Sequence, residues 1–101
     1  MSLGPVFRCP HNLDARIPQL ARSIGIRVEA LDGPGPQYIF RSGFGRIVGH
    51  RSRRENFSTI WLVFPKIHAF IPLLWVADFR LSARIEKLLQ EGGASRCEWD
   101  F

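Results

Sequence analysis

The middle of the chain consists of short runs of β-forming residues that are separated by tight breaks. Ile26, Val28 and Ala30 alternate with charged residues, which predicts a half-buried strand. The dense β-forming run at 57–64 predicts another strand. A parallel pair of strands needs a crossover of about a dozen residues or more, and the breaks between these runs are mostly shorter. The strands are therefore expected to pair antiparallel in one sheet.

The other apolar runs of this region are also interpreted as strands. Residues 38–48 are expected to form one strand that bends near Gly43–Gly45, where two glycines bracket a phenylalanine. A short strand is expected over 67–71, and a further strand over 73–79, because both runs are apolar and lie next to prolines. Together these runs predict a sheet of four to five strands.

Apolar residues at helical spacing flank the β-rich region on both sides. One stripe ends before Gly25, and the second begins after Phe79. Two amphipathic helices, N-terminal and C-terminal, packed on one antiparallel sheet of four to five strands define an α+β fold. The chain is expected to be a single domain, 1–101, with irregular termini at 1–12 and 94–101 and at most a short edge strand at Val6 and Phe7. The stripes comprise Leu13, Ile17, Leu20, Ala21 and Ile24, and Leu81, Ile85, Leu88 and Leu89.

Residues 20–26 (L-A-R-S-I-G-I), together with Val28 and Leu31, resemble the core of a helix-turn-helix motif. In that motif the alanine allows close packing of two helices, and the glycine makes the turn between them. The resemblance implies a DNA-binding module with a basic β-wing over 38–64. The alternative interpretation is a helix, a glycine and then a strand, and the pattern of residues 17–32 leaves both interpretations open.

The net charge of +5 is concentrated in one segment. The chain has 14 Lys and Arg and 9 Asp and Glu, and residues 41–54 hold five arginines and no acid, so the rest of the chain is neutral. Guanidinium groups suit phosphate because their planar fork bonds two oxygens at once. We therefore predict a small basic, non-enzymatic protein that contacts nucleic acid or another polyanion through this segment. The competing interpretation is a solvated loop whose arginines pair with Glu29, Glu55 or Glu86. The predicted contact residues are Arg41, Phe44, Arg46, His50, Arg51, Arg53 and Arg54.

Large aromatic side chains suggest a second class of function. Trp61 and Trp75 are expected in the sheet, and the C-terminal segment adds Trp99 and Phe101. A sheet rich in aromatic residues can present one face to a second subunit. The alternative function is therefore a homo-oligomeric protein–protein interaction or regulatory module whose interface contains these four residues.

Patterns for catalysis and metal binding are weak in this chain. The three histidines lie far apart in the sequence, and none has a ligand partner at the usual metal spacing. Asp78 is expected to act as a cap, or as a partner for Arg80 or Arg84, rather than as an acid or base. No catalytic residue, metal site or cofactor is predicted.

The cysteine content and the apolar segments bear on the cellular compartment. Cys9 and Cys97 are the two cysteines of the chain, fewer than small secreted domains usually carry. The N-terminus lacks the pattern of a secretion signal, and the apolar segment 60–79 is interrupted by prolines and charged residues. A cytoplasmic protein without a membrane partner is expected.

Overall fold

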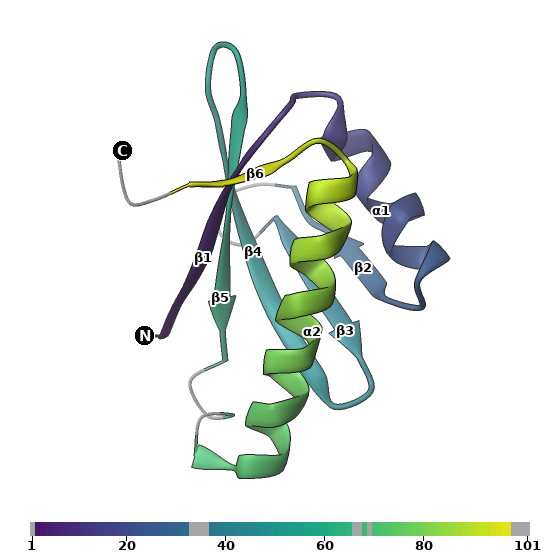
Figure 1. Ribbon diagram of the computed structural model, residues 1–101, viewed down its shortest axis with the longest axis vertical. Helices are drawn as coiled ribbons and strands as arrows, with labels where there is room; N and C mark the ends of the chain where they lie inside the picture. The colour runs from purple at the N-terminus through teal and green to yellow at the C-terminus, as the bar shows by residue number, and fades with distance from the viewer. Residues whose placement is uncertain (1, 33–36, 66–67, 69, 98–101) are drawn as a thin grey trace.

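The structure, a computed structural model, describes residues 2–32, 37–65, 68 and 70–97. Two helices and six strands follow one another along the chain in the order β1, α1, β2, β3, β4, β5, α2, β6 (Figure 1). Their bounds are Ser2–Cys9 (β1), Leu13–Ser23 (α1), Arg27–Ala30 (β2), Tyr38–Ser42 (β3), Gly45–Arg53 (β4), Ser58–Phe64 (β5), Pro72–Glu91 (α2) and Ser95–Cys97 (β6).

The six strands form one antiparallel sheet with the order β2-β3-β4-β5-β1-β6. This confirms an α+β fold with two helices and one antiparallel sheet, although the sheet has more strands than expected. Strands β1 and β6 lie in segments where the sequence predicted irregular termini, and the single strand expected over 38–48 is instead the pair β3 and β4, joined by the turn at Gly43 and Phe44. In β1 the regular alternation is broken by Gly4 and Pro5, where the pairing with β5 shifts register. β1 lies between β5 and β6, so it is not an edge strand.

The expectation of a strand over residues 73–79 is wrong, because these residues form the first half of helix α2. A continuous apolar run does not distinguish a buried strand from a helix by its periodicity. Pro72 is the informative residue, because it occupies the first turn of α2, where proline is favoured. Of the short strand expected at 67–71, residues 67 and 69 lie outside the described residues, and His68 and Ile71 are not in a strand.

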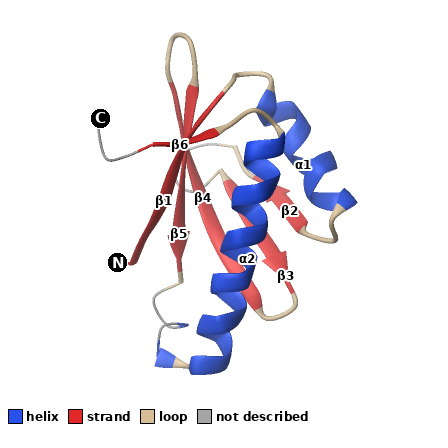
Figure 2. Ribbon diagram, in the orientation of Figure 1, coloured by secondary structure: helices blue, strands red, loops and turns tan. Residues whose placement is uncertain are grey.

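Both helices pack on the same face of the sheet, as Figure 2 shows. The predicted stripes of the two helices form the core with the facing sheet residues, and most of these side chains are completely buried. Because side chains alternate between the two faces of a strand, the neighbours of Phe40 and Ile47 lie on the face without a helix. The core includes Leu13, Ile17, Ala21, Leu81, Ile85, Leu88 and Leu89 from the helices and Phe7, Phe40, Ile47, Ile60 and Leu62 from the sheet.

The segment after α1 is a strand, so the helix-turn-helix interpretation is wrong. Gly25 has a φ of +77°, a backbone conformation that favours glycine, and the chain enters β2 directly after Ile26. Arg84 of α2 fastens this junction, because its guanidinium donates to the Ile24 carbonyl and, at 3.0 Å, to the hydroxyl of Ser42 on β3. The helix–glycine–strand interpretation is confirmed.

Candidate nucleic-acid interface

Three arginines lie side by side on the face of the sheet that carries no helix. Arg27 on β2 is the cross-strand partner of Arg41 on β3, and Arg41 is in turn the partner of Arg46 on β4. All three are exposed, and none of the ion pairs among the described residues involves them. Neighbouring strands are about 4.8 Å apart, so the backbones of the three residues span about 10 Å. We call Arg27, Arg41 and Arg46 the arginine row.

Aromatic rings follow the arginine row on the same face. His50 comes four residues after Arg46 on β4, and its cross-strand partner is Trp61 on β5. The two ring centroids are 6.0 Å apart, with the planes tilted by 49°. Both side chains are partly exposed. This face therefore offers flat ring surfaces about 13 Å along β4 from Arg46, a distance of four strand residues.

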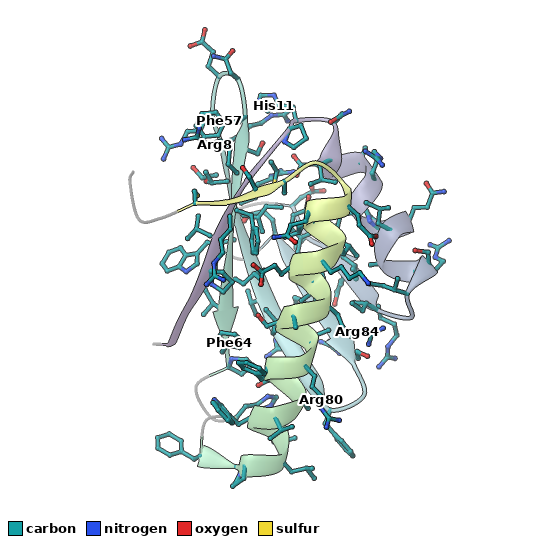
Figure 3. The ribbon with its side chains drawn as sticks, viewed as in Figure 1. Arg8, His11, Phe57, Phe64, Arg80 and Arg84 are labelled. Carbon is teal, nitrogen blue, oxygen red and sulfur yellow. The ribbon has the colours of Figure 1, made fainter. Side chains whose placement is uncertain are left out.

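A further arginine extends this face toward β1. Arg8 is exposed and pairs across the strands with Thr59, two residues from Trp61, so it shares the face of that tryptophan. Its guanidinium carbon lies 4.4 Å from the centroid of the Phe57 ring, a cation–π contact that Figure 3 shows. The residues predicted from the 41–54 segment did not include Arg8 or Arg27, which join the surface only through strand pairing.

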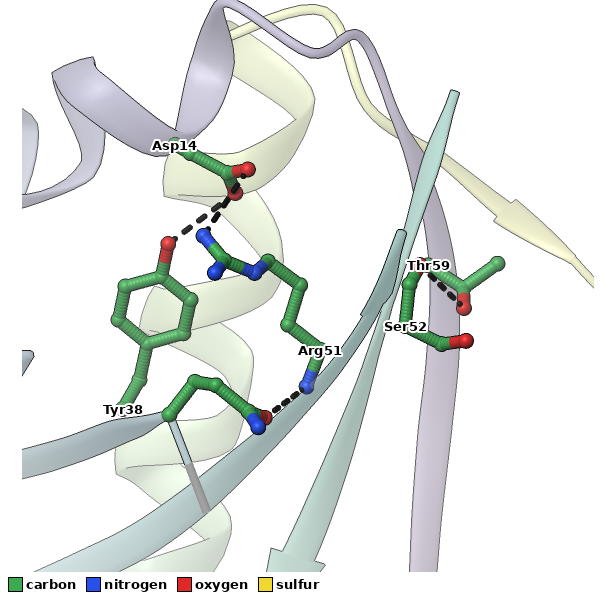
Figure 4. A network of polar contacts seen from close by, with 6 residues as sticks. Asp14, Tyr38, Arg51, Ser52 and Thr59 are labelled. Atoms are coloured by element: carbon green, nitrogen blue, oxygen red, sulfur yellow. Dashed lines mark hydrogen bonds and ion pairs between the residues drawn. The ribbon is translucent and has the colours of Figure 1, made fainter. Parts of the chain in front are cut away.

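Arg51 lies on the opposite face and is engaged by the fold. Its guanidinium is 3.2 Å from a carboxylate oxygen of Asp14 on α1, and the Tyr38 hydroxyl donates to the other oxygen of that carboxylate at 3.1 Å (Figure 4). The backbone N–H of Arg51 donates to the Gln37 side chain at 2.5 Å. Burial, with a contribution from Asp14, raises the pKa of Tyr38 to about 12. Arg51 therefore ties the sheet to α1 and does not join the arginine row.

The other predicted contact residues are divided between the two ends of the β4 strand. Phe44 is 70% exposed in the turn between β3 and β4, beside the arginine row. Arg53 and Arg54 are exposed at the other end, near the turn into β5. Arg53 is the seventh residue after Arg46 along the strand, a distance of about 24 Å. The predicted segment is thus two separate basic regions. Arg27 on β2 continues the region at Arg41 and Arg46, and Arg8 on β1 lies level with the other, because Thr59 pairs with both Arg8 and Ser52.

Asp78 of α2 holds the start of β4 in place. One of its carboxylate oxygens accepts the backbone N–H of Arg46 at 2.8 Å, and the other lies 2.6 Å from Nδ1 of His68. β5 pairs with β4 only from Val48 onward, so Asp78 supplies the acceptor that the sheet lacks at Arg46. Of the two expected roles of Asp78, the pairing with Arg80 or Arg84 is wrong among the described residues, whereas the acceptance of a backbone N–H is a capping contact. Its role is to position the strand that carries Arg46.

The four predicted interface residues do not form one surface. Trp61 lies on the helix-free face, whereas Trp75 lies on α2 and is 54% exposed. Trp99 and Phe101 lie outside the described residues. Trp75 was expected in the sheet because residues 73–79 were interpreted as a strand.

No protein-family model, curated protein or solved structure matches this chain. Neither helix of the described residues combines the length and the apolar character needed to cross a membrane. The function must therefore be inferred from the exposed residues themselves.

Proposed function

We propose that this chain is a nucleic-acid-binding protein whose helix-free sheet face binds a single strand. The observation that carries the proposal is the arginine row, in which three exposed guanidinium groups occupy adjacent register positions. Like charges directly opposite each other on a sheet destabilise it. A phosphate backbone lying across the row would neutralise this repulsion and accept two hydrogen bonds from each guanidinium.

The shape of the surface favours a single strand over a duplex. Six strands at about 4.8 Å spacing make a sheet about 24 Å wide, twice the ~12 Å width of the B-DNA major groove. A single strand can lie flat on such a surface, with its unpaired bases stacked on aromatic side chains. His50, Trp61 and the exposed Phe44 provide such rings next to the arginine row.

One acidic side chain on this face sets the direction of the bound strand. Glu29 follows Arg27 by two residues on β2, so it shares the face of the arginine row, and it is exposed. Its carboxylate repels phosphate on the β2 side of the sheet. We infer that the strand runs from Arg41 and Arg46 toward Trp61 on β5, away from Glu29.

The test compares two variants that lose the same charge. The row variant carries Arg27→Ala, Arg41→Ala and Arg46→Ala, and the control carries Arg16→Ala, Arg22→Ala and Lys87→Ala at exposed positions on the two helices. Affinity for a labelled 12-nucleotide single strand is measured by fluorescence anisotropy at ~50 mM salt. The row variant should bind at least ~10-fold more weakly than wild type, and the control within about 2-fold, because only the row variant removes side chains that neutralise phosphates in this proposal.

Heparin and a DNA duplex serve as two further ligands that distinguish the ligand class. Trp61→Leu, which keeps an apolar side chain and removes the stacking ring, should weaken binding to the oligonucleotide and leave binding to heparin unchanged. Three results would contradict the proposal: equal losses of affinity in the row variant and its control, tighter binding of a duplex than of a single strand, or no binding by the wild type at ~50 mM salt.

A further inference from the structure

The large hydrophobic side chains that are exposed in the described part of the chain gather at one end of the molecule. One of them, Phe44, is in the β3–β4 turn, and the others lie at or before the first two turns of α2. The two groups are neighbours, because a Cβ added to Gly45 would lie 2.9 Å from the carbonyl oxygen of Ala77. Figure 1 shows the β3–β4 turn and the start of α2 at the same end of the fold. We call this set the apolar end: Phe44, Phe70, Ile71, Leu73, Trp75, Val76 and Phe79.

We propose that the apolar end is the contact between two copies of this chain, with their α2 helices antiparallel across a twofold axis near Val76. This inference does not depend on the nucleic-acid proposal, because the contact is made by α2, and Phe44 at its border is the one residue that the two surfaces share. It rests on three features of the apolar end: its shape, its area and the distribution of its charges.

The apolar end combines a groove with protruding side chains. A groove of about 840 Å³ lies between α2 and the strands β1 and β6, and its aromatic walls are Phe64, Trp75 and Phe79. Phe64 lies beside α2 in Figure 3. Phe70 and Leu73 are 79% and 68% exposed, and Leu73 lies two residues before Trp75 on α2, so it projects from a side of the helix other than the groove side. A twofold contact can use both features, because each copy then offers protruding side chains and a hollow to the other.

The position of the axis follows from the spacing of these residues along the helix. With antiparallel helices and an axis at Val76, Leu73 of one copy faces Phe79 of the partner, three residues away on either side of the axis. Phe70 of one copy then lies near Ser82 of the partner, which lines the groove. An axis displaced by one turn toward the C-terminus would instead bring the two copies of Arg80 together.

The area of the apolar end approaches that of a stable interface. Phe70, Trp75 and Phe79 are 79%, 54% and 64% exposed. A large aromatic side chain can bury about 150–250 Å². The exposed parts of these three side chains therefore amount to roughly 300–500 Å² per copy, and the aliphatic residues add to this area. A standard interface buries about 800 Å² per partner.

The charges at this end fit a protein interface with a polar rim. The carboxylate of Asp78 is buried and engaged by His68 and Arg46, so no acid of the first two turns of α2 is exposed. Arg80 points outward from the helix (Figure 3) and would face the first residue of the partner helix, four residues from the axis. Its long side chain can carry the guanidinium out of the contact to solvent, which leaves the centre at Val76 apolar.

Sedimentation velocity without nucleic acid tests the contact. The wild type should sediment as a dimer at ~10 μM, and Leu73→Glu should sediment as a monomer, because it places a charge at the centre of the contact. Gln19→Glu is the matched control, since it adds the same charge at an exposed position on α1, and it should remain a dimer. A monomeric wild type at high micromolar concentration, or a Leu73→Glu variant that stays dimeric, would overturn the proposal.

Cross-linking then tests the position of the axis. Val76→Cys, in a chain that also carries Cys97→Ser, should form a disulfide between two copies under mild oxidation, because a residue on a twofold axis faces its own equivalent. Lys87→Cys in the same background should remain reduced, since it lies about 16 Å further along α2. Equal cross-linking of both variants, or a monomer that binds phosphatidylserine vesicles through this end, would contradict the twofold contact.

Discussion

Arg41 on β3 and Arg46 on β4 face each other directly across the turn that contains Gly43 and Phe44. The N–H of Arg46 points to Asp78 and not to β3, so the two arginines form a non-hydrogen-bonded pair. Cα atoms in such pairs are about 4.5 Å apart, closer than in hydrogen-bonded pairs. This arrangement costs stability in the free protein, and it provides two adjacent phosphate donors on one pleat of the sheet.

Replacing Arg41 with threonine should therefore stabilise the free protein while weakening its binding to a single strand. Removing the repulsion from Arg27 and Arg46 should gain about 0.2–1 kcal/mol, and threonine is well suited to a strand. The urea midpoint measures the effect, which should shrink at high salt because the charges are exposed. Arg53→Thr is the control, because that strand position faces Ser58 and has no cationic partner. Equal gains in the two variants would show that strand propensity alone is responsible.

Asp78→Ala should destabilise the fold by about 1–3 kcal/mol, because it leaves the N–H of Arg46 without its acceptor in a partly buried position. His68→Ala removes only the histidine contact and should cost less. Both are measured by urea unfolding at neutral pH. If the two variants lose the same stability, the bond to the start of β4 contributes nothing.

The C-terminal half of α2 should be essential for folding. Leu88 is 1% exposed and belongs to the core, so Leu88→Ala should cost about 2–5 kcal/mol. The neighbouring Lys87 is exposed, and Lys87→Ala should change stability by less than about 0.5 kcal/mol. Thermal unfolding of both variants makes the comparison, and an unchanged Tm for Leu88→Ala would place this helix outside the core.

Stability should fall as the pH rises above about 9. Burial raises the pKa of the Cys9 thiol from 9.0 to about 12, and it raises that of Tyr38 from 10.0 to about 12. Between the unfolded and the folded pKa values the unfolded chain loses these protons and the folded chain keeps them, so the balance shifts toward unfolding.

Tyr38→Phe provides the test of this pH dependence. It keeps the ring in the core and removes one of the two titrating groups, so its urea midpoint should fall less steeply than that of the wild type between pH 9 and pH 11. At pH 7 to 8 neither group contributes to the slope. Parallel curves for the two proteins above pH 9 would show that Tyr38 ionises as easily in the folded chain as in the unfolded one.

Much of the fold could be predicted from local patterns. The α1 stripe from Leu13 to Ala21 and the alternation after Gly25 each reflect one face packed against a core, and both predictions are confirmed. Residues 73–79 were misread because their apolar side chains are exposed on a helix, whereas an apolar run usually indicates burial. The N-terminal strand β1 was missed because its partners, β5 and β6, are distant in the sequence.

The candidate site could be predicted only in part, because it depends on strand register. Arg41 and Arg46 belong to the charged segment and were predicted from it. Arg27 is 14 residues before Arg41 and joins the row only through the pairing of β2 with β3. Arg51 belongs to the same charged segment as Arg46, but the alternation of side chains along β4 directs it toward Asp14 on α1. A count of charges along the sequence does not reveal on which face each side chain lies.

The most direct test of the nucleic-acid proposal is the salt dependence of single-strand binding. Each neutralised phosphate contributes about −0.7 to the slope of log K against log salt concentration, so three or four contacts, with Arg8 as the fourth, predict a wild-type slope of about −2 to −3. The row variant should lose about 2 from the magnitude of this slope, and the control lacking Arg16, Arg22 and Lys87 should keep the wild-type value. A row variant with the slope of the wild type would contradict the assignment of the helix-free face as the binding surface.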